Sequence, residues 1–185
     1  MEIIKTSIEG LVIIQPKVFQ DERGYFMESY KESFIEENFP GVKFIQDNES
    51  KSSFGVLRGL HFQKAPYEQT KLVRVVKGKV QDIAVDLRKD SPTFGKYKSV
   101  ILSSDNKKQL FIPKGFAHGF VTLSDEAVFS YKVDNIYASE FDSGVIYNDK
   151  TISIDWKMEK QDIILSEKDL SLRTFLNVKN ELLGV

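Results

Sequence analysis

The chain has 185 residues, a length that suits one domain covering residues 1–185, and 41% of them are hydrophobic, which excludes a disordered chain. Its 26 Lys and Arg against 27 Asp and Glu leave a net charge of −1, which argues against a surface built to bind nucleic acid. The lack of cysteine excludes disulfides and thiolate metal sites and fits a reducing compartment. With no secretory signal pattern and no apolar run long enough to span a bilayer, we expect a soluble, cytoplasmic protein.

Short β-rich runs recur along the chain, separated by turn signals. They cover residues 11–14, 25–29, 42–49, 56–62, 71–76, 80–87, 98–102, 109–112, 119–123 and 128–133. This spacing is typical of an all-β sandwich or barrel. Helical patterning is limited to residues 31–38 and to about 168–183, so we expect the helices to be peripheral. The Lys77-Gly78-Lys79 sequence predicts a hairpin turn, and residues 91–95 predict a longer loop.

Several predicted strands place polar residues in a regular alternation. The groups that share a face are Gln46 with Asn48 and Ser50, Phe26 with Glu28, and Lys71 with Val73 and Val75. Because one face of a small barrel lines its interior, this pattern suggests a polar pocket inside an apolar barrel. A sheet with one solvated face would give the same alternation, and for any single strand that is the commoner arrangement.

The chain has two histidines, and imidazole exchanges a proton near neutral pH. His61 lies in the run Arg58-Gly59-Leu60-His61-Phe62-Gln63. Taken alone, it reads as a strand histidine satisfied by one hydrogen bond, but an arginine and a glutamine so close on one strand are an unusual use of core positions. Strict alternation places Arg58 and His61 on opposite faces, so a shared site requires a bulge or twist near Gly59.

His118 follows the pattern Pro113-x-Gly115-x-x-His118, which resembles the second motif of the cupin superfamily, where the histidine can be a metal ligand. Metal-binding cupins supply a His-x-His pair and a carboxylate from their first motif. Here the matching stretch is His61-x-Gln63, and the chain has no third histidine. We therefore expect a cupin without a transition metal.

Other candidate residues have simple structural interpretations. Tyr131 suits a core tyrosine with a satisfied hydroxyl, although a phenol can also donate a proton to an enolate. Asp169, in Ser166-Glu167-Lys168-Asp169, fits a helix-capping box. Arg23 and Arg88 read as turn and surface charges, although a guanidinium near a site could grip a diphosphate.

Six segments in order resemble the dTDP-4-dehydrorhamnose 3,5-epimerase family. They are Phe19-x-Asp21-x-Arg23-Gly24-x-Phe26-x-Glu28, Gln46-x-Asn48-x-Ser50-x-Ser52, Gly55 through Gln63, Gln69-x-Lys71-Leu72-Val73, Asp82 through Gly95, and Ile112 through Phe120. The resemblance runs from about residue 19 to residue 169. It implies a cupin-type double-stranded β-helix, or jelly roll, that works without a cofactor and forms a homodimer.

The resemblance also implies an activity and a set of site residues. Family members epimerise a dTDP-linked 4-keto-6-deoxy hexose at C3 and C5, in dTDP-rhamnose and cell-surface polysaccharide biosynthesis. By position, His61 would be the general base, oriented by Asp169, Tyr131 the acid on the opposite face of the sugar, and Lys71 the cation that stabilises the enolate. The implied binding residues are Arg23, Phe26, Glu28, Gln46, Asn48, Arg58, His118, Tyr137, Asp142 and Lys168. Of these, Arg23 and Glu28 would reach in from the neighbouring subunit, and Asp142 stands where the family more often has Glu.

Three alternatives remain open at this stage. A C3-only epimerase of another nucleotide 4-keto sugar would use the same base, acid and lysine. A non-catalytic sugar-binding cupin would have no need of a base and an acid flanking one ligand. A metal-dependent oxygenase of cupin type ranks last, because the ligands are missing.

Overall fold

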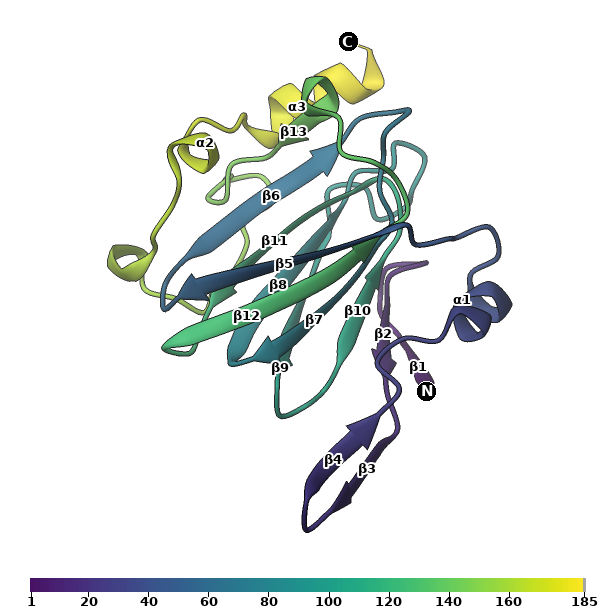
Figure 1. Cartoon of the computed structure of the whole chain (residues 1–185). Helices are drawn as coiled ribbons and strands as arrows, with labels where there is room; N and C mark the ends of the chain where they lie inside the picture. The colour runs from purple at the N-terminus through teal and green to yellow at the C-terminus, as the bar shows by residue number, and fades with distance from the viewer. Residues whose placement is uncertain (185) are drawn as a thin grey trace.

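A computed structural model describes residues 1–184, in which eleven of the thirteen strands form two facing antiparallel sheets (Figure 1). The six-stranded sheet has the order β1-β2-β10-β7-β12-β5, and the five-stranded sheet has the order β13-β6-β11-β8-β9. The first contains β1 (Glu2–Lys5), β2 (Val12–Gln15), β10 (Gln109–Ile112), β7 (Lys71–Lys77), β12 (Glu126–Val133) and β5 (Gln46–Ser53). The second contains β13 (Asp142–Gly144), β6 (Leu57–Gln63), β11 (Phe116–Thr122), β8 (Lys79–Asp86) and β9 (Tyr97–Ser103).

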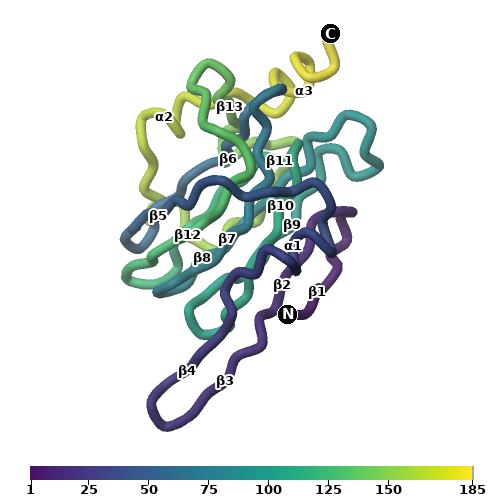
Figure 2. Tube along the Cα trace, turned by 45° about the vertical axis from the view of Figure 1, so that its right-hand side comes forward, coloured from purple at the N-terminus to yellow at the C-terminus, as the bar shows by residue number. Residues whose placement is uncertain are grey.

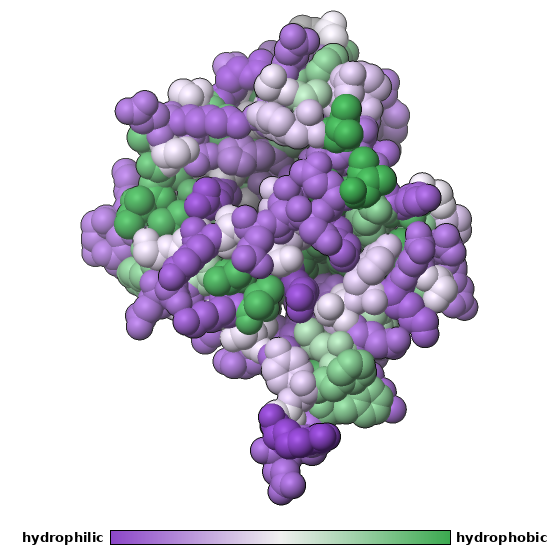
Figure 3. All heavy atoms as spheres, viewed as in Figure 1, coloured by the Kyte–Doolittle hydropathy of each residue, from purple (hydrophilic) through white to green (hydrophobic). Residues whose placement is uncertain are grey.

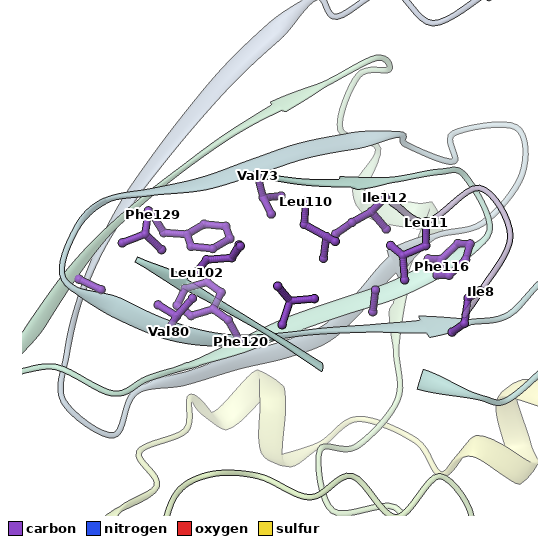
Figure 4. Close-up of a cluster of buried hydrophobic side chains, with 14 residues drawn as sticks. Ile8, Leu11, Val73, Val80, Leu102, Leu110, Ile112, Phe116, Phe120 and Phe129 are labelled. Atoms are coloured by element: carbon purple, nitrogen blue, oxygen red, sulfur yellow. The ribbon is translucent and has the colours of Figure 1, made fainter. Parts of the chain in front are cut away.

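The main core lies between the two sheets, where alternate residues of both point inward (Figure 4). Val73 and Phe129 from the six-stranded sheet pack in the same cluster as Val80, Leu102 and Phe120 from the five-stranded sheet. These side chains are almost fully buried. The expected all-β class, with inward-facing positions that fill a barrel, is confirmed.

The outer faces of both sheets are also covered. On the six-stranded sheet, α1 (Glu32–Asn38) packs its buried Ile35 against an outer cluster that includes Phe111. On the five-stranded sheet, α3 (Phe175–Leu183) contributes Phe175 and Val178 to a second cluster. The remaining helices are α2 (Glu167–Leu170) and two 3₁₀ turns, Ser139–Phe141 and Lys160–Asp162. The helices are thus peripheral, as expected, and none within residues 1–184 is long and apolar enough to cross a membrane.

One element stands away from the barrel. The hairpin of β3 (Val18–Asp21) and β4 (Gly24–Met27) projects at the bottom of Figure 1 and also in the turned view of Figure 2. Its tip is hydrophilic in Figure 3, yet Phe19, Tyr25 and Phe26 are all more than half exposed. Aromatic side chains so exposed are unusual on a free surface and are typical of a contact surface.

The structure corrects four sequence-based expectations of local structure. The strand expected at 42–49 begins only at Gln46, because Val42 and Phe44 pack against the outer cluster beside α1. The C-terminal helix expected at about 168–183 is two helices, because the backbone between them bridges to Val145 and Thr174 caps a new helix. The turn at Gly78 is not a hairpin turn, since β7 and β8 belong to different sheets. Strands β1, β3 and β13 were not expected.

Candidate active site

A cavity of about 420 Å³ opens between the two sheets. Eight of the predicted site residues line it: Asn48, Arg58, His61, Lys71, His118, Tyr131, Lys168 and Asp169. Hollows of about 620 and 550 Å³ elsewhere on the molecule contain none of these eight. The size of a cavity therefore does not identify the site, because larger hollows lack these residues. The gathering of ionisable groups in one concave space does.

His61 and Asp169 form a close pair at this cavity. The imidazole Nε2 of His61 lies 2.6 Å from Oδ1 of Asp169, although the ring is not in line for a well-directed hydrogen bond. Burial opposes ionisation of Asp169, but contacts from His61, Ser166 and the Gly59 amide outweigh it and hold the pKa of the carboxyl below its usual value. A buried carboxylate beside an imidazole orients the ring and stabilises its protonated form.

Asp169 also has the capping role that its local sequence predicts. The Oγ of Ser166 accepts a hydrogen bond from the Asp169 amide at 3.1 Å and donates one to its Oδ2 at 2.6 Å. These contacts hold the first turn of α2 against the end of the cavity. The Asp169 carboxylate therefore holds the hydroxyl of Ser166, the residue that caps α2, and also pairs with His61.

A register shift at Gly59 brings Arg58 and His61 to the same cavity. In the pairing of β11 with β6, His118 faces His61 and Phe120 faces Arg58, so one intervening residue of β11 opposes two of β6. A side chain at Gly59, where φ is +122°, would come within 2.6 Å of the Gly119 Cα. The bulge thus depends on glycine at position 59. It is the irregularity that the sequence requires if Arg58 and His61 are to share one site.

Tyr131 and Lys71 approach the cavity from the opposite sheet. Tyr131 lies on β12 and Lys71 on β7, whereas His61 lies on β6 of the five-stranded sheet. Burial raises the pKa of Tyr131, an effect that Arg58 partly offsets. Burial lowers the pKa of Lys71 to about 8, although the charges of Asp82 and Asp142 act in the opposite direction. The imidazole and the phenol thus line one cavity from its two sides.

His118 has its own carboxylate partner. Its Nε2 lies 3.0 Å from both oxygens of Asp82, which is fully buried. Sequence reasoning did not select Asp82 as a site residue. The available signal was a charged residue in the inward phase of β8, between the buried apolar Val80 and Ala84.

Three predicted binding residues form a chain beside the cavity. The hydroxyl of Tyr137 donates to Oδ2 of Asp142 at 3.2 Å, and the same oxygen pairs with the Lys168 ammonium. Hydrogen bonding to Asp142 raises the pKa of Lys168. The shorter Asp side chain at position 142 therefore still reaches two neighbours.

Two more predicted binding residues lie on β5. Gln46 donates its side-chain amide to Oδ1 of Asn48 at 2.8 Å, and Asn48 pairs across the sheet with Tyr131. On β6, Arg58 donates to the Ser52 hydroxyl at 3.1 Å, which anchors the guanidinium at the same side of the cavity. Polar groups thus surround the opening.

The structure does not bring three predicted residues to this cavity within one chain. Arg23 and Phe26 lie on the projecting hairpin, where Arg23 pairs with Asp21, and Glu28 follows the hairpin and lies 3.8 Å from Lys31. Arg88 is likewise remote from the cavity and binds the buried Asp86. Besides Asp82, the sequence analysis did not select Ser166, Phe120 and Phe129. All three line the cavity, the two phenylalanines with their aromatic rings.

No group of three or more His, Asp or Glu side chains positioned to hold a metal ion occurs within the described part of the chain. The cavity instead combines the imidazole–carboxylate pair of His61 and Asp169, the phenol of Tyr131 and the half-buried ammonium of Lys71. This set can remove a proton from one side of a bound molecule, return one from the other side and stabilise negative charge between them.

Comparisons with known proteins agree with this geometry. The family model described as dTDP-4-dehydrorhamnose 3,5-epimerase matches residues 5–177. The dTDP-4-dehydrorhamnose 3,5-epimerase of Shigella flexneri is 53% identical over 178 residues, which cover 96% of this chain and 97% of the relative. A Legionella pneumophila 3,5-epimerase structure in complex with dTDP-4-keto-L-rhamnose has a TM-score of 0.93, 47% identity and coverage of 98% and 96%. A Bacillus anthracis 3,5-epimerase structure with TDP and pyrophosphate bound has a TM-score of 0.90, 46% identity and coverage of 94% and 99%.

Proposed function

Because this chain belongs to the dTDP-4-dehydrorhamnose 3,5-epimerase family, we propose that it converts dTDP-4-dehydro-6-deoxy-D-glucose to dTDP-4-dehydro-L-rhamnose. The reaction inverts C3 and C5, the two carbons next to the C4 ketone. The observation that carries the proposal is that His61 and Tyr131 line one cavity from opposite sheets. Inversion at a carbon requires a proton to leave from one face of the sugar and return to the other.

In the proposed chemistry, His61 removes the proton next to the ketone, and the electron pair moves onto the C4 oxygen to form an enolate. Lys71 stabilises that oxygen as a cation, and Tyr131 donates a proton to the same carbon from the opposite face. The Lys71 and Tyr131 side chains both line the cavity, so both can be reached by a ligand bound there. General acid and base groups of this kind each contribute about 10²–10⁴-fold to the rate.

The binding roles follow the surroundings of the cavity. We assign the diphosphate to Arg58 and the sugar hydroxyls to the other polar side chains at or beside the cavity. The residues placed at or beside the cavity for this purpose are Gln46, Asn48, His118, Tyr137, Asp142 and Lys168. A guanidinium matches diphosphate oxygens bidentately, which a lysine cannot do.

We propose that the protein is a homodimer in which the hairpin of one subunit completes the site of its partner. This would place Arg23, Phe26 and Glu28 at the cavity that they do not reach within their own chain. The exposed aromatic rings of the hairpin support a contact surface there. We also place the enzyme in the cytoplasm, where nucleotide sugars are made.

The activity is tested with purified protein and dTDP-4-keto-6-deoxyglucose, coupled to an NADPH-dependent reductase of the product. In heavy water, NMR should show deuterium at both C3 and C5. Exchange at C3 alone would favour the C3-only epimerase, and binding without exchange would favour a sugar-binding protein. His61→Asn should abolish turnover and leave thymidine diphosphate affinity within about threefold, since the imidazole acts on the sugar ring.

The shared site is tested by mixing two inactive variants, Arg23→Ala and His61→Asn. In a mixed dimer, one of the two sites has both residues intact, so random exchange of subunits should restore about a quarter of the wild-type activity. No recovery, in a sample shown by sedimentation to contain mixed dimers, would place Arg23 in the same site as His61 of its own chain or in neither.

A further inference from the structure

Gln63 connects the strand of His61 to two loops beside the site. It lies two residues after His61 on β6, and only 7% of it is exposed. Its Nε2 donates to the carbonyl oxygens of Tyr67 at 2.7 Å and Ile136 at 3.0 Å, and its Oε1 accepts from the Ala138 amide at 2.7 Å. Two carbonyls and one N–H fix the orientation of the side-chain amide, so all three bonds act together.

These bonds hold the segment 134–138 on both sides of Tyr137, because Ile136 precedes that tyrosine and Ala138 follows it. Asn135 adds contacts between the same two loops, since its Nδ2 donates to the Pro66 carbonyl at 3.1 Å and its own carbonyl accepts from Gln69 at 2.8 Å. The position of Tyr137 relative to β6 therefore depends on a small set of amide contacts centred on Gln63.

Tyr137 in turn contacts Asp142, which pairs with Lys168 at the cavity. Asp142 also pairs with Gln63 in the register of β13 with β6. Displacement of the 134–138 segment would thus move the Tyr137–Asp142–Lys168 chain beside the cavity and leave His61, whose partner is Asp169, in place. We propose that Gln63 is a positioning residue that sets the distance between the Tyr137–Asp142–Lys168 chain and His61.

This inference rests on the proposed function for its kinetic consequence, but its structural part does not. Loss of the amide should weaken substrate binding more than the chemical step, because the groups it positions bind substrate and do not transfer protons. A purely structural role would instead lower stability and leave the Michaelis constant unchanged.

The chain offers a control on β8, which lies in the same sheet as β6 and is separated from it by β11. Gln81 is also buried, donates to the Ser99 hydroxyl at 3.0 Å and the Asp155 carbonyl at 2.8 Å, and accepts from the Lys157 amide at 2.6 Å. Like Gln63, it makes three side-chain amide bonds, but the loop that it holds through Asp155 and Lys157 has no contact with the Tyr137–Asp142–Lys168 chain. Gln63→Met and Gln81→Met therefore each remove three buried amide hydrogen bonds, at two separate places in the fold.

Amide exchange measured by mass spectrometry tests the structural part. Gln63→Met should speed exchange in residues 134–141 by about tenfold, whereas Gln81→Met should do so only in residues 153–158. In steady-state kinetics, Gln63→Met should raise KM about tenfold and change kcat less than about threefold, and Gln81→Met should leave KM within about twofold at a similar loss of Tm.

Equal KM values for the two variants, or unchanged exchange in residues 134–141 of Gln63→Met, would overturn the inference. If Gln63→Met does not fold, Asn135→Ala replaces it, and a KM within about twofold of wild type would count against the inference. If the wild-type protein has no epimerase activity, the proposed function fails, and the exchange measurement still decides whether Gln63 fixes the segment.

Discussion

Replacement of Lys71 by methionine should make the protein more stable and inactive. Burial lowers the pKa of this ammonium from 10.5 to about 8, so the folded state holds the charge at a cost. The difference between the two values corresponds to roughly 3 kcal/mol, since one pKa unit is about 1.4 kcal/mol. Lys71 is only half-buried, and solvent screening reduces the expected gain for Lys71→Met at pH 7 to about 1–3 kcal/mol.

The direction of the pH dependence follows from the same pKa values. Below about pH 8 the lysine is charged in both folded and unfolded states, so the full cost of burial is present. Between about 8 and 10.5 the unfolded state binds more protons than the folded state, so the stability of the wild type rises with pH. The advantage of Lys71→Met should therefore shrink across this range.

Urea denaturation at pH 7 and pH 10, at one fixed protein concentration, measures this effect. Lys43→Met is the control, because Lys43 is exposed, and it should change the free energy of unfolding by less than about 0.5 kcal/mol. The coupled assay should show that Lys71→Met loses at least about 10²-fold in kcat. A variant that is less stable than wild type at pH 7, or whose advantage is constant with pH, would refute the reasoning.

Three further predictions follow from the same geometry. The epimerisation rate of the wild type should fall above about pH 8, as Lys71 loses the proton that stabilises the enolate, and a rate that rises steadily to pH 10 would argue against this role. Asp169→Asn should lower kcat by about 10²–10⁴-fold with nucleotide affinity within about threefold, as measured by calorimetry. Gly59→Ala should cost more than about 3 kcal/mol, because a Cβ would lie 2.6 Å from the Gly119 Cα, whereas Gly24→Ala, which has a positive φ but open space, should cost about 1–2 kcal/mol in urea denaturation.

The local sequence predicted individual strands better than their partners. Regular short apolar runs indicated most of the strands, because the alternation of apolar and polar residues in a half-buried strand involves only residues that are close in the sequence. The pattern around Gly78 predicts a hairpin turn because two strand-like runs flanking a glycine look the same whether the strands pair or separate into two sheets. Crowding shows why glycine is needed there, since a Cβ would lie 2.1 Å from the Glu126 carbonyl oxygen, far along the chain.

For the candidate site, the sequence likewise predicted which residues share a strand face but not what that face contacts. The alternation of Gln46, Asn48 and Ser50 placed them on one face, but it left open whether that face met water or the barrel interior. Pairing with Tyr131 and Phe129 across β12 decided this, since the face of Phe129 is in the core. For Arg23 the family pattern predicts a binding role, but the fold of a single chain does not bring this residue to the cavity.

The all-β class and the peripheral helices can be read from the residue pattern alone, and the family pattern assigns one base, one phenol and one lysine to the reaction. The folded chain was needed to show that His61 contacts Asp169, that His118 contacts the buried Asp82, and that a bulge at Gly59 turns Arg58 toward the same cavity. The physical reason is that alternation and turn chemistry act between near neighbours in the chain. Charge pairing and sheet register instead depend on packing between segments that are distant in the sequence.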